Sequence, residues 1–173
     1  MDAHIHKAAA GADKTAAGAL QTATFGAGCF WGVEATFRRL AGVKSTRVGY
    51  AGGATRNPSY QDVCTDTTGH AEAVEVTFDP RIVSYHDLLN VFWENHDPTT
   101  KDRQGPDVGT QYRSVIFYHS AQQEAEARQS MAEAQKNFRR PIVTQIVAAP
   151  EFWAAEDYHQ QYLEKRGLSH CHL

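Results

Sequence analysis

A short strand, a glycine turn and an amphipathic helix are predicted to meet at Cys29, and this junction constrains the fold more than any other segment. Residues 22–25 are typical of a buried strand, and Gly26 and Gly28 permit a tight turn. Beyond the turn, apolar side chains recur at helical spacing, at Phe30, Val33, Phe37 and Leu40. The pattern therefore places Cys29 at the start of a helix.

A thiol at a helix start is a candidate nucleophile. Unpaired backbone N–H groups and the positive end of the helix dipole stabilise a thiolate there and lower the cysteine pKa below its usual value of about 8.5. Trp31 lies off the apolar stripe of the helix, so its indole is free to line a pocket beside Cys29. Position alone leaves a second interpretation open, in which Cys29 is a small buried apolar residue and Trp31 a rim aromatic.

Length and composition favour a single catalytic domain that binds neither nucleic acid nor membrane. The 173 residues are 42% hydrophobic, which suits one domain with its own core. The formal net charge is -3, and basic residues cluster no further than adjacent pairs. No apolar run approaches the ~20 residues of a membrane span, and charged residues replace a secretory hydrophobic region near the N-terminus. We expect a cytoplasmic monomer.

Three segments are predicted along the chain. Residues 1–21, rich in Ala and Gly, are expected to form a flexible tail, residues 22–163 the catalytic domain, and residues 164–173 a mobile, polar C-terminal tail. The cysteines, Cys29, Cys64 and Cys171, are too few and too odd in number for a structural disulfide framework. A bond between any two of them is therefore expected to be catalytic.

The remaining patterns predict an α+β fold with a mixed sheet. Strands are expected at 46–50, 70–78, 112–118 and 142–147, and helices after Ser84 and Ser120. Tyr60 is predicted on a turn-rich loop. Residues 97–110 have no periodicity and carry Asp107, and so long a connection without secondary structure is usually functional.

Glu72 is the second chemical signal, because it interrupts the apolar face of its predicted strand. Desolvation on that face would raise the carboxyl pKa from about 4.3 toward neutrality and make Glu72 a candidate general acid. The alternative is a carboxylate near a strand end that reaches water. His70 on the same face is either a core histidine or a partner of the site.

Five runs of residues together resemble the methionine sulfoxide reductase A family. They are GCFWGVE (28–34), GYAGG (49–53), TGHAEAV (68–74), FWENHDP (92–98) and GTQYRS (109–114), and they follow the family's order. The resemblance covers roughly residues 23–163. It implies a two-layer α+β sandwich, in which helices flank a mixed β-sheet with a ferredoxin-like core.

The resemblance also implies a reaction, the thiol-dependent reduction of the S epimer of methionine sulfoxide, free or in oxidised proteins, as a repair after oxidative stress. Cys29 would be the nucleophile, Glu72 would protonate the sulfoxide oxygen, and Tyr60 and Tyr112 would bind that oxygen. These residue types suit the chemistry, because a sulfoxide oxygen leaves poorly until it is protonated or strongly hydrogen-bonded.

Substrate binding is assigned by the same resemblance. Phe30 and Trp31 would form the pocket for the methyl group of the sulfoxide. Asp107 precedes the tyrosine of GTQYR by five residues, as in the family, and would help to organise the site. The reaction needs no organic cofactor and no metal.

The tail is expected to complete the cycle. Attack on the sulfoxide leaves a sulfenic acid on Cys29, which condenses with a second thiol, and the mobile Cys171 is the expected resolving residue. Many family members have two tail cysteines, whereas this chain has one, which favours direct reduction of the Cys29–Cys171 disulfide by thioredoxin. Cys64 is expected to pack beside Val63.

Two other classes of function fit parts of the sequence. A cysteine-nucleophile hydrolase or acyltransferase would use Cys29 with His70, but the sequence offers no clear third group to orient the histidine. A metal-binding module would have to draw its ligands from both termini, without the spacing of a structural zinc site; the candidate ligands are His4, His6, His170, Cys171 and His172.

Overall fold

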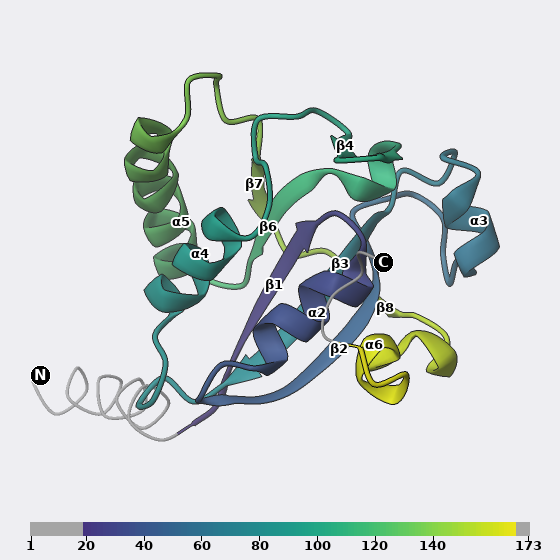
Figure 1. Ribbon diagram of the computed structural model, residues 1–173, viewed down its shortest axis with the longest axis horizontal. Coiled ribbons are helices and arrows are strands. Elements are labelled where there is room, and N and C mark those ends of the chain that lie inside the picture. Colours follow the sequence, from purple (N-terminus) through teal and green to yellow (C-terminus); the bar gives the residue numbers. More distant parts are fainter. Residues whose placement is uncertain (1–18, 169–173) are drawn as a thin grey trace, which may run out of the picture.

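The computed structural model describes residues 19–168, which build one mixed sheet with helices packed on it (Figure 1). The six strands lie in the order β7-β6-β1-β3-β2-β8, and neighbours run antiparallel except β6 and β7, which are parallel. The predicted mixed sheet is confirmed. The strands are β1 (Gln21–Ala27), β2 (Val43–Ala51), β3 (Ala71–Phe78), β6 (Ser114–Tyr118), β7 (Gln145–Ala148) and β8 (Trp153–Ala154).

The centre of the sheet has ferredoxin-like topology, as expected. Its elements follow one another as β1, α2 (Phe30–Arg38), β2, β3, α4 (Tyr85–Glu94) and β6, and the four strands lie side by side in the order β6-β1-β3-β2. The helix α5 (Ala121–Ala134) then connects β6 to its parallel neighbour β7. This connection adds a strand to one edge, and β8 extends the other.

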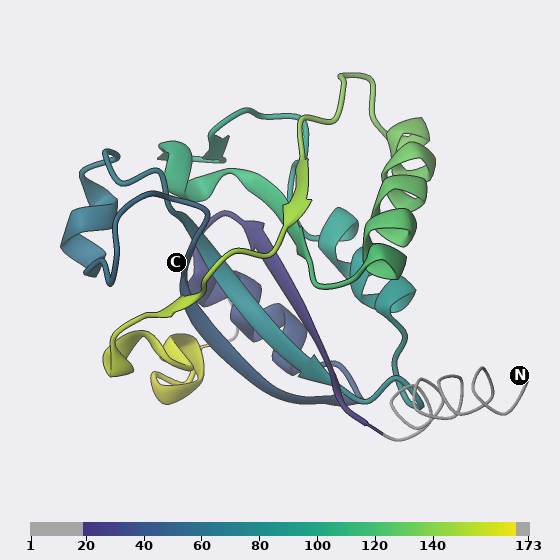
Figure 2. The same cartoon turned by 180° about the vertical axis from the view of Figure 1, so that it is seen from behind.

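Helices cover one face of the sheet, and an extended segment crosses the other. Residues of α2, α4 and α5 share a single core cluster with the strands. Figure 2 shows the opposite face, which the chain between β7 and β8 crosses. There Phe152 and Ala149 pack on a smaller buried cluster centred on Val115 and Phe117.

An aromatic cluster holds the Cys29 junction in place. The ring of Phe25 on β1 stacks on Phe37 of α2 at 5.0 Å between centroids, and on Phe92 of α4 at 5.3 Å. All three side chains are buried, and each such burial contributes about 1.5–3 kcal/mol to folding. The strand before Cys29 and the helix after it are therefore fixed to each other and to α4.

Helix starts agree with the capping signals in the sequence. Ser84 and Ser120 cap α4 and α5 as predicted, and Ser84 forms a reciprocal capping box with Asp87. Ser59 forms the same motif with Asp62 and starts the short helix α3 (Tyr60–Cys64). The prediction that Tyr60 lies on a loop is therefore wrong.

The structure also corrects the interpretation of residues 97–110. This segment contains a small hairpin of β4 (Arg103–Gln104) and β5 (Asp107–Val108) and leads into the 3-10 turn η1 (Thr110–Tyr112). Tyr112 thus precedes the strand to which the sequence pattern assigned it. The elements are too short to produce periodicity.

Beyond β7, the sequence predicted no further element, but the structure contains three within residues 149–168. They are β8, the 3-10 turn η3 (Asp157–His159) and the short helix α6 (Tyr162–Lys165); a further turn, η2 (Gln135–Asn137), ends α5. Among residues 19–168, no helix is long and apolar enough to cross a membrane.

Candidate active site

Cys29 lies at the junction of β1 and α2, as predicted. It is the N-cap residue of α2, with φ -57° and ψ 121°, and it is partly exposed. Gly28 before it has φ +99°, a conformation that favours glycine. A Cβ at Gly28 would also lie 2.8 Å from Cγ of Gln104, so the β4–β5 hairpin packs directly against this turn.

The carboxylate of Glu72 reaches the same helix start from β3. Its Oε1 atom accepts a hydrogen bond of 3.1 Å from the backbone N–H of Phe30, the residue after Cys29. Glu72 is 2% exposed, so the alternative of a carboxylate that reaches water is wrong. The nucleophile and the acid suggested by the sequence thus meet at the first turn of α2.

Two tyrosines are electrostatically coupled to Glu72. Burial is the largest cause that raises the hydroxyl pKa of both Tyr60 and Tyr112 above the usual value, and the charge of Glu72 raises each further. The charge of Cys29 also contributes at Tyr112. Because such couplings weaken with distance, these groups form one site. Both phenols stay protonated at neutral pH and can donate hydrogen bonds.

Asp107 lies near Tyr112, and Cys64 lies near Tyr60. Asp107 on β5 is half-buried, and its charge raises the pKa of Tyr112. Cys64 is one helical turn after Tyr60, and its thiol is hydrogen-bonded to the Tyr60 hydroxyl. The side chain of Cys64 is exposed, so the prediction that it is packed beside Val63 is wrong.

Of the two aromatic residues after Cys29, Phe30 lies in the core and Trp31 lies at its edge. Phe30 is 1% exposed, and its ring contacts Tyr50 at 5.7 Å between centroids. Trp31 is partly buried at the edge of the core and stacks on Tyr162, at 3.7 Å between centroids and 6° between planes. The indole is therefore held flat against α6 and not inside the core, consistent with its place off the apolar stripe.

The sequence interpretation missed residues 156–162, whose side chains hydrogen-bond to aromatic residues of the site. His159 is fully buried, and its Nδ1 accepts a hydrogen bond of 2.9 Å from Nε1 of Trp31. Burial lowers the pKa of His159, so the ring is neutral at neutral pH. The carboxylate of Glu156 accepts one bond of 2.9 Å from the backbone N–H of Tyr60 and another of 2.9 Å from the Tyr50 hydroxyl. The run EDYHQQY (156–162), rich in polar and aromatic residues, was the sequence feature that could have indicated this segment.

His70 holds a loop and does not serve as a base. Its Nδ1 accepts from the backbone N–H of Gly53 at 3.0 Å, and its Nε2 lies 2.6 Å from the carbonyl oxygen of Thr55. With both nitrogens engaged by backbone, the hydrolase alternative loses its histidine.

The predicted terminal residues lie outside the part of the chain that the structure describes. They are Cys171 and the four histidines of the metal alternative, His4, His6, His170 and His172. Within residues 19–168, no cluster of three or more metal-ligating side chains is found.

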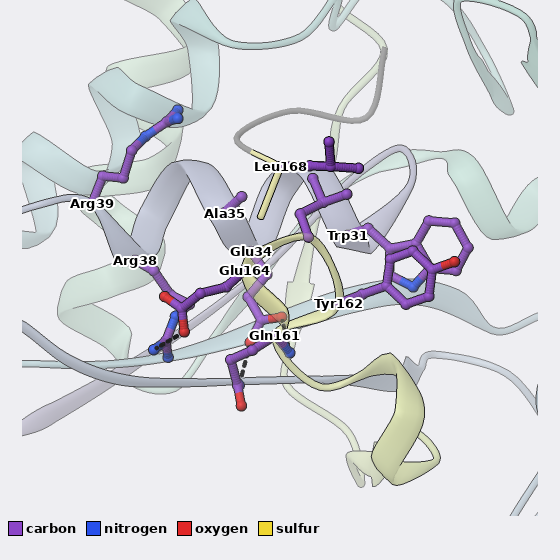
Figure 3. Close-up of a pocket in the computed structure, with 10 residues that line it drawn as sticks. Trp31, Glu34, Ala35, Arg38, Arg39, Gln161, Tyr162, Glu164 and Leu168 are labelled. Carbon is purple, nitrogen blue, oxygen red and sulfur yellow. Dashed lines mark hydrogen bonds and ion pairs between the residues drawn. The ribbon is translucent and has the colours of Figure 1, made fainter. Parts of the chain in front are cut away.

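A cavity of about 150 Å³ lies beside Trp31 (Figure 3). It is bounded by α2 on one side and by α6 on the other, and Tyr162 and Leu168 contribute to its lining. Leu168 is the last residue that the structure describes.

Comparisons with known proteins point to one family. Residues 21–173 match the family model described as peptide methionine sulfoxide reductase. A Methanoculleus marisnigri protein named peptide methionine sulfoxide reductase MsrA is 62% identical over 154 residues, which cover 88% of this chain and 94% of that protein.

Solved structures agree with this match. Reduced Mxr1 from Saccharomyces cerevisiae superposes with a TM-score of 0.83 at 35% identity and covers 87% of this chain and 91% of its own. A second structure, Mxr1 in complex with Trx2, has a TM-score of 0.60 at 26% identity and covers 83% and 84% of the two chains.

Proposed function

The chain belongs to the peptide methionine sulfoxide reductase family and reduces methionine sulfoxide to methionine, and we propose which of its residues carry out each step. The observation that carries the proposal is the hydrogen bond between Glu72 and the backbone N–H of Phe30. It places a buried carboxyl group beside the residue that bears the attacking sulfur, Cys29. The preferred substrate is the S epimer, free or within oxidised proteins, which makes the activity a repair reaction.

In the first step, the Cys29 thiolate attacks the sulfoxide sulfur while the Glu72 carboxyl group transfers its proton to the sulfoxide oxygen. A bond forms between the two sulfurs. That bond then breaks as the hydroxyl group passes to the Cys29 sulfur, so methionine leaves and Cys29 becomes a sulfenic acid. The substrate sulfur is reduced by two electrons, and the cysteine sulfur is oxidised by two.

The tyrosines hold the oxygen while its charge develops. Burial raises the pKa of Tyr60 and Tyr112, which keeps both hydroxyls protonated, and a protonated phenol donates a hydrogen bond to a developing oxyanion. Asp107 acts beside Tyr112 and helps to organise the substrate there.

Phe30 and Trp31 form the apolar wall that receives the methyl group of the sulfoxide. Phe30 contributes a ring fixed in the core, and Trp31 contributes a ring held by His159 and Tyr162. Rigid aromatic surfaces suit this role, because they bury a methyl group without losing side-chain freedom on binding.

The second step regenerates the nucleophile. The Cys171 thiol attacks the sulfenic sulfur of Cys29, which forms a disulfide and releases water. Cys171 follows Leu168 by three positions, a span of at most about 11 Å, and Leu168 lines the cavity beside Trp31. In this proposal, residues 22–163 form the catalytic domain, and residues 164–173 form the tail that carries the resolving thiol.

A dithiol protein then reduces the disulfide. The solved complex of Mxr1 with Trx2 supports thioredoxin as this partner, acting directly on the Cys29–Cys171 bond because the tail carries one cysteine. All electrons in this cycle come from thiols, and we propose that it runs without metal or organic cofactor. Action as a monomer in the cytoplasm remains a prediction.

A stereoresolved single-turnover assay tests the proposal. Reduced protein is mixed with excess S or R methionine sulfoxide in the absence of other thiols, and the methionine released is counted per protein. The S epimer should give about one methionine per chain, since one dithiol supplies one two-electron reduction. Cys29→Ser should give none. Equal release from both epimers, or release by Cys29→Ser, would overturn the assignment.

A further inference from the structure

Glu34 is a buried carboxylate to which the proposed chemistry gives no role. It lies on α2 and is 1% exposed. Its Oε1 accepts a bond of 2.9 Å from the backbone N–H of Gln161, and its Oε2 accepts from Nε2 of Gln161 at 2.8 Å and from the Thr46 hydroxyl at 2.7 Å. Burial of a carboxylate is costly unless it is hydrogen-bonded, and Gln161 supplies two of these three bonds.

Gln161 has an unfavourable backbone that needs such support. With φ 49° and ψ 44° it lies in the left-handed region, where a side chain is rarely accommodated. It immediately precedes α6, so its conformation sets the direction in which Tyr162 leaves. Clamping both the main chain and the side chain of Gln161 therefore fixes the position of the Tyr162 ring.

The ring of Tyr162 in turn supports Trp31. The two rings stack at 3.7 Å, and Trp31 lies three residues before Glu34 on the same helix and hence on the same face. Figure 3 shows Glu34, Gln161, Tyr162 and Trp31 around the cavity. The contacts form a closed path that starts and ends on α2.

We propose that Glu34 is a positioning residue for substrate binding, which acts through Gln161 and Tyr162 to hold the indole of Trp31 as the wall of the methyl pocket. The inference rests on the proposed function, because it takes Trp31 as that wall. It adds a group that contacts neither the substrate nor the reacting sulfur.

A second anchor separates this role from a purely structural one. Gln160 binds the neighbouring strand through both ends of its amide: its Oε1 accepts from the backbone N–H of Val48, and its Nε2 donates to the carbonyls of Val48 and Ala155, each at 2.9–3.0 Å. These bonds do not involve Glu34. Loss of the Glu34 carboxylate should therefore leave the segment attached but release Gln161 and the Tyr162 ring.

The test compares Glu34→Gln with Glu164→Gln, a matched control. Glu164 is a largely exposed carboxylate on α6, and its side chain is paired with Arg38. The steady-state KM for methionine S-sulfoxide, the amount and rate of first-turnover methionine release at saturating substrate, and the melting temperature are measured for each.

In Glu34→Gln, an amide N–H replaces one of the oxygens that accept bonds from Gln161 and Thr46, so at least one of these bonds is lost. We therefore expect KM to rise about tenfold, the scale of a lost hydrogen bond to a charged group. First-turnover release should stay within about twofold of wild type, because Cys29 and Glu72 are untouched. Glu164→Gln should change KM by less than about twofold, as expected for an exposed pair. Added to Trp31→Ala, Glu34→Gln should raise KM no further, because both changes act on one wall.

An unchanged KM in Glu34→Gln, with or without a lower melting temperature, would overturn the inference. A further rise in KM on the Trp31→Ala background would overturn it too. If Glu34→Gln does not fold, Gln161→Gly addresses the same path, since glycine accepts the left-handed backbone but removes the side-chain bond; it should raise KM severalfold, and an unchanged KM there would overturn the inference. A wild-type protein that reduces no sulfoxide would instead defeat the proposed function.

Discussion

The Oε1 atom of Glu72 lies 3.1 Å from the backbone nitrogen of Phe30. This contact joins strand β3 to the first turn of α2 and spans 42 residues of sequence. The Glu72 carboxyl group, which the strand pattern identified, therefore lies at the same helix start as the Cys29 thiol, which the helix pattern identified.

The two phenols should share the oxygen of the substrate. We expect Tyr60→Phe and Tyr112→Phe each to slow first-turnover methionine release by about tenfold or more, and the double variant by at least about a hundredfold, since removing one donor from an oxyanion site costs about 100–1000-fold. Rapid-quench measurement of methionine checks this. A double variant as fast as wild type would remove both hydroxyls from the mechanism.

Cys64 is a rival to Cys171, because its exposed thiol lies against Tyr60 in the site. We nevertheless expect Cys171→Ser to release its first methionine, retain a sulfenic acid on Cys29 that a dimedone-type reagent traps, and lose thioredoxin-driven turnover. Cys64→Ser, which keeps a hydroxyl for Tyr60, is the control and should turn over normally. Peptide mapping of oxidised wild type that shows a dominant Cys29–Cys64 bond would make Cys64 the resolving residue.

Acid should destabilise the fold through His96. Burial lowers the pKa of this ring to about 4, and its Nδ1 and Nε2 lie 2.6 Å from the Phe92 carbonyl and 2.8 Å from the Ser114 hydroxyl. An unfolded chain protonates near pH 6.5, before the folded one, so stability from the neutral ring is present above pH 6.5 and is lost as pH falls toward 4. The loss should be about 2 kcal/mol, since the ring is only half-buried and each pKa unit is worth about 1.4 kcal/mol.

Urea unfolding at pH 7 and pH 4.5 measures this loss. In His96→Gln, the decrease between the two pH values should be smaller by about the same 2 kcal/mol. An equal decrease in both proteins would assign acid sensitivity to other groups.

The parts of the site that local patterns predict are those built on long, regular elements. Helical spacing located Cys29, and strand alternation placed Glu72 on a buried face. Tyr60 was misplaced although the Ser59–Asp62 capping box was present, because only five helical residues follow it. Tyr112 was misplaced because the 3-10 turn that carries it has three residues and no periodicity.

The C-terminal support of the site could not be predicted from local patterns. Residues 156–162 are fixed by partners more than 90 positions away, such as the bond from Trp31 to His159 and the bonds from Gln160 to Val48. The fold of such a segment depends on long-range hydrogen bonds and ring stacking rather than on its own propensity. The run of polar and aromatic residues signals a functional segment, but not its conformation.

The proposed mechanism depends on proton transfer from the Glu72 carboxyl group to the sulfoxide oxygen while Cys29 attacks. The most direct measurement is the rate of first-turnover methionine release by Glu72→Gln at neutral pH, with saturating methionine S-sulfoxide and with the melting temperature as a check on folding. The amide oxygen can still accept the Phe30 N–H bond, but the amide has no acidic proton to transfer, so the rate should fall about a hundredfold or more while the fold is kept. A folded Glu72→Gln protein that releases methionine at the wild-type rate would contradict this proton transfer and leave Glu72 a structural role only.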